Sequence, residues 1–434
     1  MGATTGDHNG GDLPGARRLR RTGLALAALA AAATLSACGG TTRTGPVAQA
    51  PAATPAAPAE PAKPRPGEGG RVGVTETARV ALLLPLSAPD PAAAAVARDL
   101  SDAAKLAETD AAGLLTLDLR DTRGAEDVAV AAAMSAMNAG DALVLGPLFG
   151  AYAAPVGQAV AAGGLNVISF SNTPSAGGAN VWISGLLADS EAERILDYAQ
   201  SQGIRHIGLY HPDNALGRVA RRAVTDAAGR RGITVDPIMA YPRSFEGIQN
   251  SAGAYAEAHR ASGAQAALLP DEGQGLAAAA SFLRYNSIGV GETYFLGLGG
   301  WADPALSRET SLDGGRFAAP DPERMAAFAA RFQGAYGRAP GKYAWLGYDA
   351  VSAAAAMVRA ARTRGDEHPF GLDDITAPDG FEGVAGPLVF TSDGLNSRGL
   401  AVLRASGSGP TVLETAPGGA LPAAAAALAA LSGS

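Results

Sequence analysis

The sequence predicts an α/β fold made of two doubly wound lobes, and three observations support this prediction. Strands and helices alternate from residue 79 onward, as they do in proteins with parallel sheets. The same alternation begins again near residue 190, which indicates a second lobe of the same kind. The chain has 434 residues, of which 47% are hydrophobic and 17% charged, so it can build a large core in more than one lobe.

The first lobe is predicted from three strand–helix units in succession, which make half of a doubly wound domain. Residues 79–85 (RVALLLP) form a continuous apolar run, typical of a strand that is buried on both faces of a parallel sheet. The segments between strands carry Ala, Leu and Val at the period of a helix. We expect strands at 79–85, 115–119, 142–145 and 166–169, and helices at 91–109, 125–139 and 153–162.

The second lobe follows the same order of elements without repeating the residues, so the similarity lies in the pattern. We expect helices at 190–202, 216–230, 247–261 and 273–286, and strands at 206–210, 234–239, 266–269 and 294–298. A further apolar helix is expected at 344–361.

Residues 1–37 have the order of charge and hydropathy that a secretory signal peptide needs. Four arginines between residues 17 and 21 precede an apolar stretch at 23–33, which is too short to span a membrane. The residues LSACG at 35–39 resemble the lipobox of bacterial lipoproteins, which implies that the chain is cut before Cys38 and lipidated there. The alternative is an ordinary signal peptide with an incidental cysteine. Cys38 is the only cysteine, which excludes disulfides within the chain and C-x-x-C metal or redox sites.

Two low-complexity segments flank the lobes. Residues 38–78 are rich in Pro, Ala, Thr and Gly and have no apolar period, so we expect an extended linker. About 39 residues of polyproline II, at roughly 3.1 Å per residue, would reach on the order of 120 Å. Residues 417–434 are expected to form an Ala-rich flexible tail.

The chain is acidic, with a formal net charge of −7. Removal of residues 1–37 takes away four Arg and two Asp, so the charge becomes −9. This charge does not suit nucleic acid as a partner. In many lipoproteins an Asp after the lipidated cysteine marks the inner membrane, and Gly39 in its place favours a lipid anchor in the outer membrane, facing the periplasm.

Two segments carry a resemblance to a known superfamily. VALLLPLSAP at 80–89 and LVLGPLFGAYAAPVGQAVAAGGLNVISFSNT at 143–173 resemble type I periplasmic binding proteins of the leucine-binding kind. The resemblance implies two Rossmann-like lobes, three crossings with a hinge, and a cleft between the lobes. It places the first lobe at 79–186 and 318–395, and the second at 187–317 and 396–416.

Shorter pieces resemble one group within that superfamily. VLGPLFGAY, NALGRVARR, LLPDEGQGL and WLGYDAVSAAA are similar to the C-terminal domain of outer-membrane lipoproteins that activate penicillin-binding proteins. Those activators carry a helical-repeat domain before this one, where the present chain has its Pro-rich linker. The resemblance implies a regulator of peptidoglycan synthesis that binds a penicillin-binding protein.

Candidate site residues stand at the carboxyl ends of predicted strands, where helix N-termini offer free N–H groups. Ser87 follows the first strand. Gly150 aligns with a serine that holds the ligand carboxylate in amino acid receptors, so the hydroxyl is absent, although a backbone N–H could still bind an anion there. Thr173 matches the second carboxylate-binding position of the receptors, with Ser171 two residues earlier. The alternative for Ser171 and Thr173 is capping of the next helix.

The second lobe contributes three further candidates. Asp271 falls near the acid that would receive a ligand ammonium group, and Glu272 lies beside it; the alternative for both is a capping acid at a helix start. Trp301 either lines the cleft or belongs to the core. Leu216 stands where the receptors have an aromatic wall, which is a second departure from their pattern.

Motifs for catalysis are missing. There is no Gly-x-Ser-x-Gly elbow or phosphate loop, and the His residues make no pair at metal-binding spacing. We therefore expect neither an enzyme nor a cofactor or metal. Two functions remain: an activator of a penicillin-binding protein, which the activator-like pieces favour, or the receptor of a branched-chain amino acid-type ABC transporter, whose partners would be a small amino acid-like ligand and an ABC permease. Either function can be built on this fold.

Overall fold

The computed structural model describes residues 65–417, with the exception of residue 292. The predicted signal peptide, Cys38, most of the predicted linker and residues 418–434 lie outside the described residues. Within the described part, no helix combines the length and the apolar character that crossing a membrane requires.

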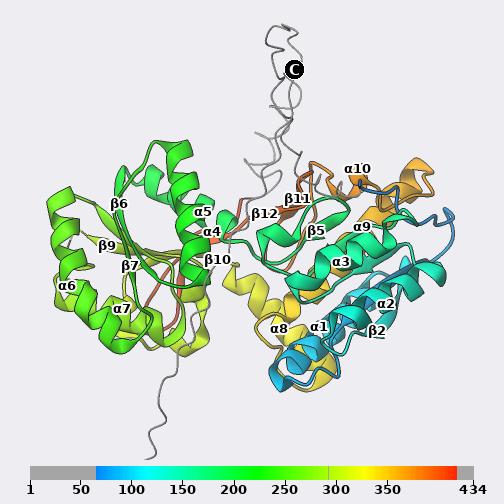
Figure 1. The fold of residues 1–434 in the computed structure, drawn as a ribbon, viewed down its shortest axis with the longest axis horizontal. Helices are drawn as coiled ribbons and strands as arrows, with labels where there is room; N and C mark the ends of the chain where they lie inside the picture. The colour runs from blue at the N-terminus through cyan, green and yellow to red at the C-terminus, as the bar shows by residue number, and fades with distance from the viewer. Residues whose placement is uncertain (1–64, 292, 418–434) are drawn as a thin grey trace, which may run out of the picture. The chain divides into compact units, whose positions relative to one another are not determined.

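The sheet of the first lobe has five parallel strands in the order β2-β1-β3-β4-β5 (Figure 1). This is the order of a doubly wound sheet, which reverses direction between β1 and β3. The strands are β1 (Ala78–Leu84), β2 (Leu115–Asp121), β3 (Leu143–Leu145), β4 (Val167–Ser169) and β5 (Val181–Ile183).

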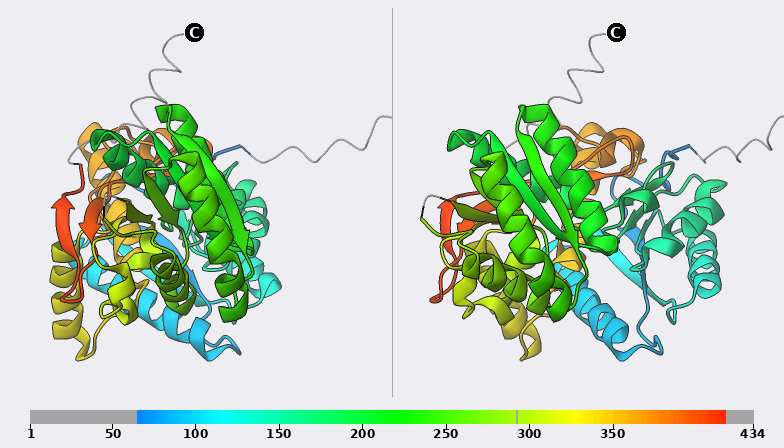
Figure 2. Two further views of the ribbon diagram at one scale, coloured as in Figure 1. Left: turned by 90° about the vertical axis from the view of Figure 1, so that its left-hand side faces the viewer. Right: turned by 60° about the vertical axis from the view of Figure 1, so that its left-hand side comes forward.

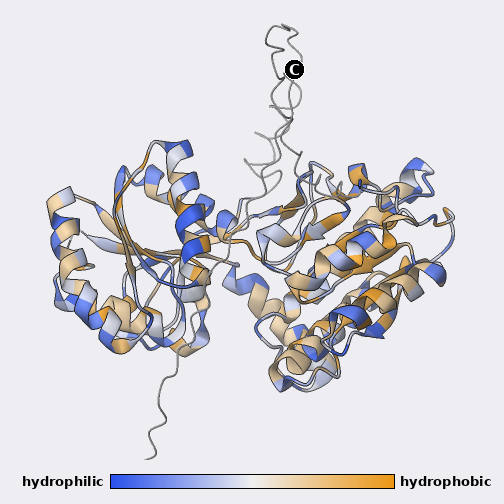
Figure 3. Ribbon diagram, in the orientation of Figure 1, coloured by the Kyte–Doolittle hydropathy of each residue, from blue (hydrophilic) through white to orange (hydrophobic). Residues whose placement is uncertain are grey.

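Helices cover both faces of this sheet. One face packs against α1 (Pro91–Asp110) and α9 (Ala344–Arg364), the other against α2 (Glu126–Asn138) and α3 (Gly150–Ala161). Alternate residues of β1 enter the two cores: Val80, Leu82 and Leu84 face α1 and α9, whereas Ala81 and Leu83 face α2 and α3. The apolar run predicted as a doubly buried strand therefore has the burial that it indicated. Figure 3 colours the chain by hydropathy and shows hydrophobic segments in both lobes.

The second lobe repeats this arrangement. Its seven-stranded sheet has the order β14-β13-β10-β9-β8-β6-β7, with β13 and β14 antiparallel at one edge (Figure 2). Helices α4 and α5 cover one face of the sheet, and α6 and α7 cover the other. The elements are α4 (Ala188–Ser201), β6 (His206–Pro212), α5 (Ala215–Arg231), β7 (Thr234–Tyr241), α6 (Phe245–Ser262), β8 (Ala266–Leu269), α7 (Gly273–Tyr285), β9 (Tyr294–Gly297), β10 (Arg316–Ala319), β13 (Ala401–Arg404) and β14 (Thr411–Glu414).

The five parallel strands of the second sheet, β7-β6-β8-β9-β10, have the same order as the five strands of the first. This shared topology explains why the strand–helix pattern begins again near residue 190 without any repeat of the residues. The predicted α/β architecture of two doubly wound lobes is therefore the observed one.

The chain passes between the lobes three times, at residues 184–187, 320–321 and 399–400. These positions lie within a few residues of the expected boundaries. The first and third crossings lie side by side, because Asn396 Nδ2 donates to the carbonyl oxygens of Ile183 at 2.7 Å and Gly185 at 2.9 Å. The remaining elements are α8 (Pro322–Tyr336), α10 (Leu372–Ile375), β11 (Leu388–Phe390), β12 (Asn396–Arg398) and the short 3-10 helices Pro174–Ala176, Gly299–Ala302, Pro304–Leu306 and Thr310–Leu312.

The folded body begins earlier than residue 79, where the sequence analysis ended the linker. Gly69 N donates to Gly164 O at 3.0 Å, Gly70 N donates to Ala142 O at 2.9 Å, and Val72 is buried in the core of the first lobe. A Cβ on Gly67 would lie 1.9 Å from Gly164 O. The glycines that suggested a linker by composition are therefore needed for close packing against the edge of the sheet where its strands begin.

Candidate ligand-binding site

A cavity of about 820 Å³ lies between the lobes, at the carboxyl edge of the first sheet. Its volume is in the range of sites for small organic ligands. The first lobe lines the cavity with residues from segments 148–150, 170–173, 185–186 and 320–346, and the second lobe with residues from segment 299–304 and with Leu403 and Pro410. The cavity lies beyond the carboxyl ends of β3, β4 and β5, and this edge of a doubly wound sheet is the one at which ligands bind.

Two hydroxyl residues after β4, Ser171 and Thr173, form one edge of the cavity, and the buried Ser169 at the end of β4 supports them. Ser169 Oγ donates to Pro147 O at 2.9 Å and accepts from Ser171 N at 3.2 Å. Ser171 Oγ in turn accepts from Thr173 N at 3.0 Å, and Ser171 is only 5% exposed. Since a hydroxyl group has one donor and two acceptor positions, the Ser171 O–H remains able to donate to a ligand.

Thr173 also lines the cavity, and its hydroxyl group makes no hydrogen bond to the backbone of the described residues. Thr173 stands at the N-cap position of the 3-10 helix Pro174–Ala176, but its side chain makes no capping hydrogen bond. The Thr173 side chain therefore does not cap this helix, which was the alternative role considered for it.

Gly150 begins α3 three residues before the predicted helix start, so that the N-terminus of α3 opens onto the cavity. No side chain caps α3, and the first N–H groups of a helix have no partner within the helix. A Cβ on Gly150 would lie 2.5 Å from Ser171 Oγ and 3.3 Å from Thr173 Cβ. The Ser171 hydroxyl therefore occupies the space that a side chain at position 150 would need, and it supplies the hydroxyl that this turn lacks.

A further part of the wall comes from the start of α9. Lys342, Tyr343 and Trp345 line the cavity there. Lys342 Nζ lies 5.4 Å from the ring centroid of Tyr343, and none of the carboxylates in residues 65–417 that the structure describes forms an ion pair with it. Trp345 is 5% exposed, and Arg398 Cζ lies behind it, 4.8 Å from its ring centroid.

One carboxyl group lies just behind the cavity wall. A Cβ on Gly299, which lines the cavity, would lie 2.2 Å from Glu191 Oε1. Burial raises the pKa of Glu191 to about 7, against the opposing effects of a backbone hydrogen bond from Gly299 and the positive charge of Lys342. The Glu191 carboxyl group is therefore close to the midpoint of its titration at neutral pH.

These groups together favour an anion. The donors are the hydroxyls of Ser171 and Thr173, the N–H groups at the start of α3 and the ammonium group of Lys342. The positive end of the α3 dipole adds to this preference. Apolar side chains, including Phe149, Leu186, Met325 and Trp345, form much of the remaining wall.

The acidic candidates lie elsewhere. Asp271 does not line the cavity: its carboxylate accepts from Tyr241 Oη at 2.7 Å and from Arg243 Nε at 2.9 Å, and the side chain is fully buried. The expected role as acceptor of a ligand ammonium group is therefore contradicted, because in-chain donors already surround the carboxylate. Glu272 is exposed at the N-cap position of α7 and makes no side-chain capping bond.

Trp301 and Ser87 are not part of the cavity wall either. Trp301 is 4% exposed, donates from Nε1 to Leu269 O at 2.9 Å and stacks on Phe317, so it is a core residue of the second lobe. Ser87 is exposed and pairs with Asp121 through both its hydroxyl and its backbone N–H. Of the seven candidates, the structure brings Gly150, Ser171 and Thr173 together.

Three residues of the cavity wall, Lys342, Tyr343 and Trp345, were not predicted from the sequence. The available signal was the start of the apolar helix after GRAPGKY, since a helix N-terminus at a carboxyl edge is a common ligand position. Among the residues that the structure describes, no group of three or more His, Cys, Asp or Glu side chains could hold a metal ion.

Solved structures with the same fold come from several bacteria. A Rhodospirillum rubrum protein assigned to a branched-chain amino acid ABC transporter matches with a TM-score of 0.67 and 19% identity, over 78% of this chain and 100% of that one. The periplasmic ligand-binding protein of such a transporter from Burkholderia xenovorans matches with a TM-score of 0.61 and 17% identity, over 79% and 96%. An ABC transporter substrate-binding protein from Desulfitobacterium hafniense has a TM-score of 0.59 and 21% identity, over 78% and 100%. These similarities confirm the predicted type I fold.

No curated protein matches the sequence. The model of one protein family, described as periplasmic binding protein, matches residues 77–410. This match covers both lobes and all three crossings. It agrees with the expectation of a periplasmic binding protein. The chain belongs to the periplasmic binding protein family.

Proposed function

We propose that the chain is the solute-binding receptor of an ABC-type uptake system, which captures a small organic anion between its lobes. The observation that carries this proposal is the cavity that is lined by Ser171, Thr173, the open N-terminus of α3 and Lys342, all of which can donate to an anion. Such a cavity, with apolar walls and a few convergent polar groups, has the form of a small-molecule site.

Proteins of similar fold support the receptor function, but their ligands differ from one protein to the next. The Desulfitobacterium hafniense protein is also known in complex with Leu, at 20% identity to this chain. Two solute-binding proteins of Rhodopseudomonas palustris hold 3,4-dihydroxybenzoic acid and benzoate, at 15% and 16% identity. Since one scaffold serves several ligands, the choice for this chain depends on its own side chains.

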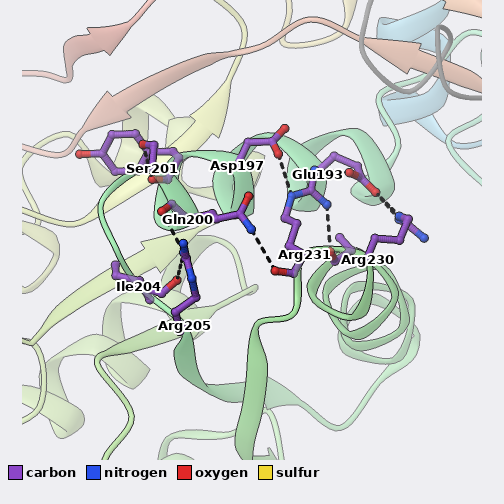
Figure 4. Close-up of polar contacts among 10 residues, drawn as sticks. Glu193, Asp197, Gln200, Ser201, Ile204, Arg205, Arg230 and Arg231 are labelled. Atoms are coloured by element: carbon purple, nitrogen blue, oxygen red, sulfur yellow. Dashed lines mark hydrogen bonds and ion pairs between the residues drawn. The ribbon is translucent and has the colours of Figure 1, made fainter.

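The activator hypothesis remains the second candidate, on the residues that resemble the activators. It requires a surface that binds a penicillin-binding protein, and the arginines that follow one another along α5 offer a candidate surface. Two of them are already paired: Arg230 and Arg231 bond to Glu193, and Arg231 Nε also donates to Asp197 at 2.7 Å (Figure 4). Arg222 also pairs with Asp226 on the same helix at 3.5 Å, which leaves the exposed Arg218 and Arg221 for a protein partner.

A ligand screen separates the two functions. The purified chain is heated with single amino acids, amides and organic acids, and the shift of its melting temperature is measured. A receptor gives a saturable rise with some of these compounds, because ligand binding stabilises only the folded state. The rise should vanish in Thr173→Val and persist in Thr225→Val, a threonine on α5 outside the cavity. No shift with any compound, together with faster glycan polymerisation by a penicillin-binding protein, would favour the activator.

Attachment to the membrane is a further part of the proposal. We propose that lipid on Cys38 anchors the receptor. Gly39 suggests the outer membrane, whereas a receptor must meet a permease in the inner membrane. Fractionation of labelled envelopes decides between them. Cys38→Ser should release the chain from membranes altogether, and retention of this variant on membranes would exclude the lipid anchor.

A further inference from the structure

The second lobe does not offer the carboxylate that recognition of an amino acid requires. Asp271 stands at the carboxyl end of β8, but it accepts hydrogen bonds from Tyr241 Oη, Arg243 Nε and its neighbour Glu272 N, the last at 2.8 Å. Its charge is compensated by Arg243, and its side chain has no exposed surface. A ligand ammonium group would have to displace a buried ion pair to reach it.

Three other carboxyl groups lie near the cavity, and none is an uncommitted, fully charged part of its wall. Glu272 is exposed beside Gly300 and does not line the cavity. Asp303 lines the cavity, but its Oδ1 accepts from Ala305 N at 2.9 Å and caps the 3-10 helix Pro304–Leu306. Glu191 lies behind Gly299 and is not part of the wall; because burial raises its pKa to about 7, it carries its full negative charge only above neutral pH. The cavity thus lacks an uncommitted, fully charged acid.

The cavity instead has more donors than one carboxylate needs. Ser171, 5% exposed, keeps a hydroxyl proton for a ligand, and Thr173 makes no capping bond. Both lie beside the open N-terminus of α3 at Gly150. Lys342 has no carboxylate partner within the described residues. Charge-assisted bonds from such donors to a carboxylate are among the stronger hydrogen bonds in proteins.

The rest of the wall suits an apolar body. The apolar side chains that line the cavity include Phe149, Leu186, Met325 and Trp345. Arg398 Cζ lies over the ring of Trp345, 4.8 Å from its centroid. Burial of apolar ligand surface against these side chains stabilises the complex without any polar contact.

From these contacts we infer that the ligand is a small monocarboxylate with an apolar body and no α-ammonium group. Its carboxylate lies against Ser171, Thr173 and the start of α3, and its apolar part lies against Phe149 and Trp345. This inference rests on the proposed receptor function and names the class of ligand of that same cavity.

Calorimetric titration of the purified chain with two matched pairs of ligands tests the inference. The pairs are 3-phenylpropanoate with L-phenylalanine and 4-methylpentanoate with L-leucine, whose members differ only in the α-ammonium group. We expect each acid to bind at least about tenfold more tightly than its amino acid, because the ammonium group would lose water without gaining a partner. Equal or tighter binding of the amino acids would overturn the inference while leaving the receptor function intact. If no member of either pair binds and the wider screen is also silent, the receptor function itself fails.

Two variants sharpen this test. Lys342→Met should weaken binding of both acids at least about tenfold, whereas Lys105→Met, on α1 outside the cavity, should not. Asp271→Asn should leave the preference for the acid unchanged, because Asp271 does not contact the ligand. A selective loss of amino acid binding in Asp271→Asn would show that Asp271 receives an ammonium group and would overturn the inference.

Discussion

Arg398 and Asp349 form a fully buried ion pair directly behind the cavity wall, with Arg398 Nη1 2.7 Å from Asp349 Oδ2. Arg398 also donates to the carbonyl oxygen of Ser184 at 3.3 Å, and its backbone N donates to Ser190 Oγ at 3.2 Å. The pair thus joins α9 to the first and third crossings. Since Trp345 lies under Arg398, the same contact holds one wall of the cavity in place.

Removing one partner of this pair should destabilise the fold strongly. Arg398→Met leaves the Asp349 carboxylate buried without its cation, which typically costs about 3–5 kcal/mol of unfolding free energy. Urea denaturation measures the loss. The matched control is Arg331→Met, which removes a half-exposed ion pair with Asp110 and should cost at most about 1 kcal/mol. If both variants lost the same unfolding free energy, the buried ion pair would stabilise the fold no more than the half-exposed pair does.

Gly150→Ala should weaken ligand binding by moving Ser171. The new Cβ would meet Ser171 Oγ at 2.5 Å, so the hydroxyl must rotate away from the cavity edge. We expect a loss of affinity of about tenfold by calorimetry, the size of one hydrogen bond to a charged group. Gly334→Ala on α8 is the control, since a Cβ there meets no atom within 4 Å.

The two changes at this edge should not be additive. If Gly150→Ala acts through Ser171, then adding it to Ser171→Ala should cause little further loss. Independent losses that sum in the double variant would mean that Gly150 contributes in another way.

Asp141 should make the fold less stable as the pH rises. Burial, together with the neighbouring Asp118, raises the pKa of Asp141 to about 6, although Arg79 and Arg120 oppose this. A carboxyl group whose pKa is raised on folding contributes stability that is complete below its unfolded pKa and is lost as the pH passes its folded pKa. Relative to Asp141→Asn, the wild-type chain should lose about 1 kcal/mol between pH 5 and pH 8.

Urea denaturation at the two pH values measures this difference. Asp379→Asn is the control, because Asp379 is exposed and takes part in none of the hydrogen bonds or ion pairs found in the described residues. A pH dependence that Asp141→Asn leaves unchanged would assign the effect to other groups.

Glu191 should make ligand binding pH-dependent. As the pH rises through about 7, Glu191 gains a negative charge near the cavity, in a setting that also contains Lys342 and Glu272. A carboxylate ligand should therefore bind more weakly at pH 8 than at pH 6, by about fivefold if the charges interact with about 1 kcal/mol. Titrations at both values should show this change in the wild-type chain and not in Glu191→Gln. If affinity depended on pH in the same way in both proteins, Glu191 would not be the group that causes the pH dependence.

The part of the site on the first lobe could be predicted because it is local. Gly150 and Thr173 follow adjacent parallel strands, and the carboxyl ends of adjacent parallel strands meet at one edge of a sheet. The apolar run of β1 likewise indicated a strand buried on both faces. In each case a short stretch of sequence contains the whole physical reason.

The rest could not be predicted because it depends on contacts between distant segments. Lys342 and Trp345 reach the cavity only after the chain has passed through the second lobe and returned. Asp271 was placed correctly at the end of β8, but its partner Arg243 lies 28 residues earlier, on another strand–helix turn. The sequence around an acidic residue does not show whether distant donors, such as Arg243 for Asp271, pair with it in the fold.

The start of the folded body shows a limit of composition as a guide. Residues 67–72 have the glycines of a linker, yet their backbone bonds to the first lobe. The predicted linker therefore ends near residue 66 and not at residue 78. Its attachment at the edge where the strands begin leaves the cavity, at the opposite edge, open to a ligand.

Calorimetric titration of the wild-type chain and of the double variant Ser171→Ala/Thr173→Val with 3-phenylpropanoate tests the central claim most directly. We expect one site per chain in the wild-type protein and a loss of affinity of at least about tenfold in the double variant. Absence of saturable heat in the wild-type chain, or equal affinity in the two proteins, would contradict it.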